Sequence, residues 1–136
     1  MQNNPHGRYQ IGTQYLDENI MILKFMDQWN IQTAHQCVED CLAAAQEHFS
    51  GEPWGSVADY REWGLCTPDV MEYFNQSAHL FAQNKLTYQA VIPNNQLQSM
   101  IIDGYSEIIN NKVTTKYFTN EAEAITWIRK MLNPNT

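Results

Sequence analysis

The stretch that decides the fold is Pro53–Met71, with the sequence PWGSVADYREWGLCTPDVM. Residues 54–58 are mostly small or apolar, which is typical of a central strand buried on both faces. Residues 59–63 are then charged and aromatic together. Thr67 follows as an N-cap and Pro68 as a first helical residue, so a helix is predicted to begin there. The pattern predicts a buried strand whose polar end faces a helix N-terminus, where open α/β sheets place their ligand sites.

Two strands are predicted before this stretch. Period-two alternation over residues 8–15 indicates a half-exposed strand, and residues 20–26 are apolar on nearly both faces. Residues 17–19 form a turn between them, so the pair is predicted to be an antiparallel hairpin. Apolar residues at helical spacing over 31–49 then predict an amphipathic helix before the central strand.

Strands and helices continue to alternate after the central strand. The expected elements are a helix from Pro68 to about Asn84, a strand over 86–92, a helix over 97–109, a strand over 113–118, and a last helix capped by Asn120. The order ββαβαβαβα predicts an α/β fold with a mixed, mostly parallel five-stranded sheet and about four helices. Residues 1–136 are expected to form one domain, with 1–7 as a loose tail.

Composition narrows the function classes. The 136 residues are 43% hydrophobic and 17% charged, as in a folded globular domain, and the net charge is −7. A scattered set of eight Lys and Arg residues argues against nucleic acid and anionic membranes as partners. No apolar leader and no run long enough for a membrane span are present. Three cysteines, an odd number, favour a reducing cytoplasmic location over a disulfide framework.

The chain resembles the SpoIIAA-like fold of STAS domains, and more closely small bacterial proteins described as STAS-like or CRAL-TRIO-related. The resemblance rests on the hairpin-first order and on several stretches: Gly7-Arg8-Tyr9, Gly51-Glu52-Pro53-Trp54, Asp59-Tyr60-Arg61-Glu62-Trp63, Leu65-Cys66-Thr67-Pro68 and 121–128. It implies a regulatory, non-enzymatic module. Anti-sigma-factor antagonists carry a phosphorylatable serine in an Asp-Ser-Ser-Gly-type stretch at the corresponding helix start. This chain has Cys66-Thr67-Pro68-Asp69 there, which leaves Thr67 as the candidate phosphorylation site.

The candidate binding residues are Asp59, Arg61, Glu62, Trp63 and Thr67. Strand alternation predicts that Asp59 and Arg61 project together, with Glu62 on the opposite side. Arg61 could grip a carboxylate or phosphate near the helix amides, or it could only pair with Asp59 and fix the loop. Thr67 could accept a phosphoryl group or serve only as the N-cap. Trp63 is expected in a polar loop, covering a pocket or exposed for a partner.

Other chemistries lack a complete pattern. Cys37 and Cys41 share a helix with His35 and His48, but no zinc-ligand spacing is present, so no metal is expected. No Gly-rich phosphate loop is found, and no cofactor is expected. Cys66 precedes a helix N-terminus that could lower the pKa of its thiol, yet no histidine is placed near it by sequence.

Three functions follow in order of support. The first is a non-enzymatic regulatory or protein-interaction module, with an unidentified protein partner and a homodimer as an open alternative. The second is a carrier or sensor of a small apolar or amphipathic, lipid-like ligand in a cleft between the second and third helices, whose Met and aromatic residues could equally be plain core. The third is a small enzyme that uses Asp59 or Glu62 as a base.

Overall fold

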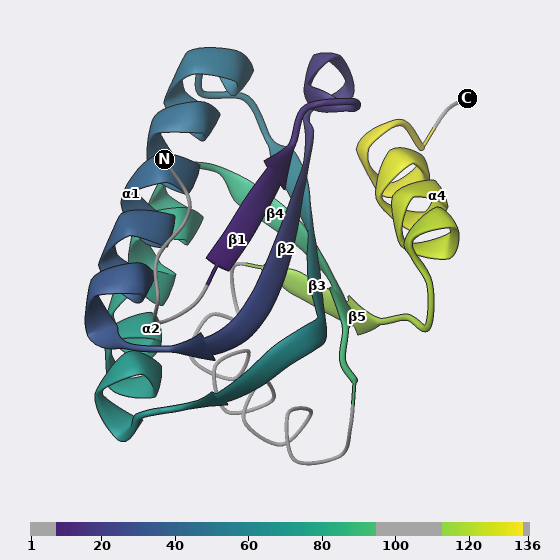
Figure 1. The fold of residues 1–136 in the computed structure, drawn as a ribbon. Helices are drawn as coiled ribbons and strands as arrows, with labels where there is room; N and C mark the ends of the chain where they lie inside the picture. Colours follow the sequence, from purple (N-terminus) through teal and green to yellow (C-terminus); the bar gives the residue numbers. More distant parts are fainter. Residues whose placement is uncertain (1–7, 95–112, 135–136) are drawn as a thin grey trace.

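A five-stranded sheet forms the middle of the molecule in the computed structural model, which describes residues 8–94 and 113–134. Helices α1 and α2 cover one face, and α4 lies against the other (Figure 1). The elements are β1 (Arg8–Gly12), a 3₁₀ helix (Leu16–Glu18), β2 (Ile20–Trp29), α1 (Ile31–Phe49), β3 (Trp54–Cys66), α2 (Pro68–Gln83), β4 (Leu86–Ile92), β5 (Thr114–Tyr117) and α4 (Glu121–Leu132).

The strands lie side by side in chain order, β1-β2-β3-β4-β5. β1 is antiparallel to β2, and every later neighbour pair is parallel. The predicted fold class is therefore confirmed, including the central place of β3. The helix predicted over 97–109 lies outside the described residues. Among the described residues, no helix is long and apolar enough to span a bilayer.

Each face of the sheet has its own apolar core. The larger core packs α1 and α2 on side chains such as Phe25, Ala58 and Val91, and the smaller core packs α4 on Ile22, Val57 and Ile92. This split follows the period-two alternation of the strands.

The hairpin differs from the prediction. β1 ends at Gly12 instead of Tyr15, and a 3₁₀ helix takes part of the connection. The reason is Leu16, which is buried and turns the chain inward, while Asn19 reverses it in the left-handed conformation at φ 64°.

Polar caps fix the starts of two helices. The Asn30 side chain accepts a hydrogen bond from the Thr33 amide at α1, and Asn120 accepts one from the Glu123 amide at α4. The predicted cap of the last helix is confirmed, and Asn30 caps the first.

Candidate interaction site at the end of the central strand

The central strand was predicted from residues 54–58, and in the structure it continues through the charged and aromatic stretch to Cys66. Its pairing with β4 stops at Asp59, whereas its pairing with β2 continues to the Trp29–Cys66 pair. Residues 25–29 and 60–66 thus form a two-stranded ribbon, which curls beneath the starts of α1 and α2 (Figure 1). Register shifts occur between Lys24 and Met26 and again between Asp27 and Trp29. Such bulges bend and twist a strand pair, which explains the curl.

An aromatic cluster fills the inner side of the ribbon: Phe25, Trp29, Tyr60, Trp63 and Phe74. Phe25 stacks on Tyr60 with ring centroids 4.2 Å apart, and Trp29 meets Trp63 edge-on at 5.7 Å. Trp63 is only 3% exposed. The prediction that Trp63 lies in a polar loop is therefore wrong, because its ring is the part of the ribbon that packs against the core.

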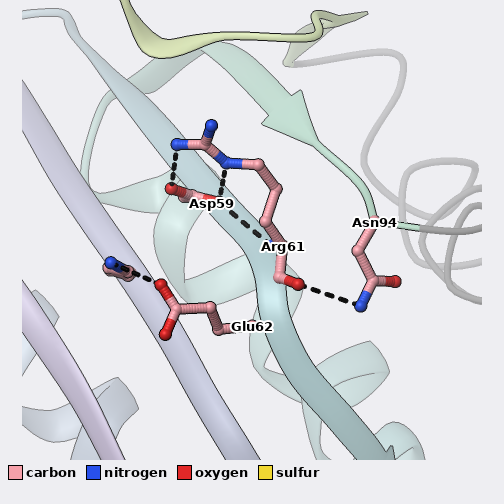
Figure 2. Close-up of polar contacts among 5 residues, drawn as sticks. Asp59, Arg61, Glu62 and Asn94 are labelled. Carbon is pink, nitrogen blue, oxygen red and sulfur yellow. Dashed lines mark hydrogen bonds and ion pairs between the residues drawn. The ribbon is translucent and has the colours of Figure 1, made fainter.

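Asp59 and Arg61 form a two-bond ion pair on the outer side (Figure 2). Arg61 Nε donates to Asp59 Oδ1 at 3.0 Å and Nη2 donates to Oδ2 at 2.8 Å. The Arg61 backbone amide also donates to Oδ1 at 3.0 Å. The Asp59 side chain is 3% exposed and that of Arg61 is 45% exposed. The carboxylate is thus buried and held by its neighbour two residues on, as the bracing interpretation predicts.

The charges of the pair are mutually stabilised. Burial disfavours the Asp59 carboxylate, but the hydrogen bonds and charge of Arg61, with a contribution from Lys24, outweigh burial and lower the pKa of Asp59. The same hydrogen bond raises the pKa of Arg61, which also senses the charge of Glu121 at the start of α4. Asp59 therefore stays ionised at neutral pH, and its pairing with Arg61 makes it a weaker base than a free aspartate.

Glu62 lies on the same side as Asp59, and the prediction that it projects opposite is wrong. It pairs with Lys24 at 2.7 Å, and Lys24 is the residue of β2 opposite Asp59. The first bulge inserts an extra residue into β3, so the alternation of side chains slips by one after Tyr60. The Glu62 side chain is 57% exposed, which leaves it open to a partner.

Asn94 braces the ribbon from the end of β4. Its side-chain amide donates to the Arg61 carbonyl at 3.0 Å and to the Trp63 carbonyl at 3.4 Å (Figure 2 draws the first bond). No local signal could reveal this role, because the bonds join residues more than 30 positions apart.

Thr67 is exposed at the N-cap of α2, as predicted, but its side chain makes no capping bond. Its hydroxyl donates to the Asp69 carboxylate instead. Pro68 at the next position has no N–H to offer. Burial raises the pKa of the neighbouring Cys66 thiol to about 11, so the nearby helix N-terminus does not lower it.

A groove adjoins the polar side of the ribbon. Its volume is about 620 Å³, and it lies where the start of α4 approaches the β1–β2 pair. The residues that line it are Tyr9, Gln10, Ile11, Gly12, Gln14, Ile22, Lys24 and Glu121. Lys24 therefore joins the groove to the ion pairs of the ribbon, and the two features form one continuous surface.

A small cavity lies between the sheet and helices α1 and α2. Its volume is about 50 Å³, and its walls are mostly apolar, including Phe25, Phe74 and Phe81. Ser56 and Gln89 are register partners on its floor, and Gln89 Oε1 is buried with no hydrogen-bond partner among the described residues. A single water needs roughly 10–15 Å³ by this measure, so the space fits only a few heavy atoms.

The metal-ligand residue types are dispersed. Cys37 and Cys41 are buried in the core, and His35 stacks on Tyr73 with ring centroids 4.1 Å apart. No three His, Cys, Asp or Glu side chains converge within residues 8–94 and 113–134. The cysteines of α1 thus serve as small core residues.

Two solved structures show the fold class of the protein. The fold is similar to that of an uncharacterised Shewanella loihica PV-4 protein of the DUF3478 family with a SpoIIAA-like fold, with TM-score 0.69 and 17% identity over 94% of this chain and 98% of that one. It is also similar to the unphosphorylated anti-sigma factor antagonist SpoIIAA, with TM-score 0.64 and 7% identity over 89% of this chain and 96% of that one. The protein therefore has a SpoIIAA-like fold, as the resemblance implied.

The family follows from the sequence itself. The chain belongs to the family described as "Domain of unknown function (DUF7793)", which matches residues 14–132. No curated protein matches the sequence. The match begins within the hairpin and ends at the last residue of α4, so it covers the candidate site together with all four parallel strands.

Proposed function

We propose that the protein is a non-enzymatic regulatory module of STAS type that binds a partner protein, in the cytoplasm, through the ribbon and the first turn of α2. The observation that carries the proposal is a preformed polar surface at the end of the central strand. Arg61 and Glu62 are exposed there, and both are tied to buried or neighbouring groups. A surface that is already rigid loses little conformational entropy on binding.

The partner would meet a surface whose cations are already paired. Lys24 is matched by Glu62 and Arg61 by Asp59, while Asp69 and Glu121 lie at the two flanking helix starts. The balance is negative, so a partner segment with Lys or Arg residues is favoured by charge. Arg61 Nη1 makes no hydrogen bond within the described chain, and it can still bind one acidic group of that partner.

Thr67 gives the proposed module a means of regulation. The SpoIIAA structure is described as that of an unphosphorylated antagonist, which fits a switch by phosphorylation in that protein. Here the Thr67 hydroxyl contacts the Asp69 carboxylate, so a phosphate would repel Asp69 and break that contact. We infer that phosphorylation of Thr67 would change partner binding while leaving the sheet intact.

The test is affinity capture from the native host followed by titration of the purified partner. Glu62→Ala should weaken binding at least about tenfold, roughly 1.4 kcal/mol. Glu47→Ala is the matched control, because Glu47 is also exposed but lies at the other end of α1. Equal binding by both variants and the wild type would refute the site.

A second function, a sensor of a small ligand, is favoured by the cavity and by the unpartnered Gln89 Oε1. Such a ligand would need a hydrogen-bond donor and only a few heavy atoms. Native mass spectrometry of protein purified from its host tests this function. A retained small molecule that is lost in Gln89→Leu would support it, and an unliganded mass for both proteins would exclude it.

A further inference from the structure

The outward side of α4 carries a shallow hollow that is separate from the ribbon. Trp127 lies half-buried at its centre and packs against Phe118, with ring centroids 5.5 Å apart. Its volume is about 410 Å³, and the residues that line it are Phe118, Ala122, Glu123, Thr126, Trp127 and Lys130. Met131 follows one turn after Trp127 and is 36% exposed. The hollow therefore has an aromatic floor, and its small side chains, Ala122 and Thr126, would let another protein surface come close to the helix.

Opposite charges stand at the two ends of this hollow. Glu123 and Lys130 are seven residues apart, which is two helical turns or about 10.5 Å along the axis. Thr126 and Trp127 lie midway between them. Neither charge forms an ion pair with any described residue, although the Glu123 carboxylate accepts a hydrogen bond from the Asn120 side chain. A stripe along α4 thus consists of Glu123, Thr126, Trp127 and Lys130, and it is acidic at its Glu123 end and basic at its Lys130 end.

We propose that α4 packs against α4 of a second copy of this chain, across a two-fold axis that passes between Thr126 and Trp127. An interface between identical surfaces must be complementary to itself. When the two helices run antiparallel, Glu123 of each copy meets Lys130 of the partner subunit, so the stripe meets this condition. Parallel packing would instead place like charges together.

The charge of the remaining surface favours this choice of occupant. The protein carries a net charge of −7, so two copies repel each other over most of their surfaces. The α4 hollow differs because it holds one acidic and one basic residue around apolar groups. Aromatic residues and Met are enriched at protein interfaces, and Trp is common among the residues that contribute most to binding.

The experiment is sedimentation over a wide concentration range with two charge-reversal variants. Lys130→Glu and Glu123→Lys should each raise the dimer dissociation constant at least about tenfold, because two attractive pairs become repulsive. An equimolar mixture of the two variants should dimerise again, since a stripe with two acidic ends in one chain would face a stripe with two basic ends in the other. Lys85→Glu, in the exposed turn after α2, is the matched control and should dimerise as the wild type does.

A third variant keeps the test decisive if Glu123→Lys weakens the start of α4. Thr126→Arg alters an exposed residue at the centre of the stripe and should abolish dimerisation while circular dichroism stays unchanged. A wild-type monomer at every concentration would overturn the proposal. A dimer that persists in both Lys130→Glu and Thr126→Arg would also overturn it, because the interface would then lie elsewhere.

Discussion

Replacement of Arg61 by alanine tests whether the Asp59–Arg61 pair supports the fold. The change removes two charge-assisted hydrogen bonds and leaves the Asp59 carboxylate, 3% exposed, with only the backbone bond. Breaking a fully buried pair costs about 3–5 kcal/mol. Arg61 is 45% exposed, and water can replace part of the lost bonding, so we expect a loss of about 2–3 kcal/mol at pH 7.

The assay is urea unfolding followed by tryptophan fluorescence, because Trp29 and Trp63 lie in the cluster beneath the pair. In a thermal unfolding experiment, the same loss of stability would lower Tm by roughly 8–12 °C for a domain of this size. Arg8→Ala is the matched control, since Arg8 pairs with Asp27 at 2.8 Å but both side chains are about half exposed. That control should cost less than about 1 kcal/mol.

The stability lost in Arg61→Ala should also depend on pH, which gives a second test of the bracing role. The pKa of Asp59 is lowered in the folded wild type, so this carboxylate contributes stability above its unfolded value of 3.8. That contribution is lost as the pH falls through the lower folded pKa. In Arg61→Ala, no guanidinium offsets the burial of the Asp59 carboxylate, so burial disfavours its charged form. Protonation of Asp59 at low pH then removes the cost of burying that charge. The stability gap between the two proteins should therefore narrow below about pH 4. A small loss that does not depend on pH, together with lost partner binding, would refute the bracing role.

Three further predictions concern single positions. Gly55→Ala should destabilise the protein by about 1–3 kcal/mol in chemical denaturation, because an added Cβ would lie 2.3 Å from Ile128 Cγ2; an unchanged midpoint would contradict the packing of α4. Asn120→Ala should cost about 1 kcal/mol through loss of its bond from the Glu123 amide, and hydrogen exchange should localise the effect to the start of α4. Cys66 should react with a thiol reagent far more slowly than a free cysteine at pH 8, since its pKa is about 11; rapid labelling of the folded protein would show that the thiol is not shielded.

The sheet could be predicted from the sequence because its signals are local. Period-two runs and period-3.6 runs alternate along the chain, and caps such as Asn120 mark where helices begin. Parallel order follows once a helix separates successive strands. The position of Gly55 beneath Ile128 carries no such signal, since it depends on how α4 docks on the sheet.

The ribbon could not be predicted for a physical reason. Its buried aromatic residues, Tyr60 and Trp63, are three positions apart, which breaks the period of two expected of a strand. The spacing arises from a bulge opposite Phe25, and bulges depend on the partner strand. The mixture of charged and aromatic residues over 59–63 therefore resembled a loop. The pairing of Asp59 with Arg61 was foreseen from the sequence, whereas the side on which Glu62 projects and the burial of Trp63 were not.

The bulge separates residues that hold the ribbon from residues that a partner can reach. Asp59 and Trp63 are buried, so substitutions there act on the fold before they act on recognition. Glu62 and Thr67 are exposed, and no described backbone amide depends on either side chain. Arg61 belongs to both groups, because Nε and Nη2 bind Asp59 while nearly half of its side chain is exposed. Loss of binding in an Arg61 variant is therefore evidence for a contact only when Glu62→Ala, which leaves the buried pair in place, weakens the same partner.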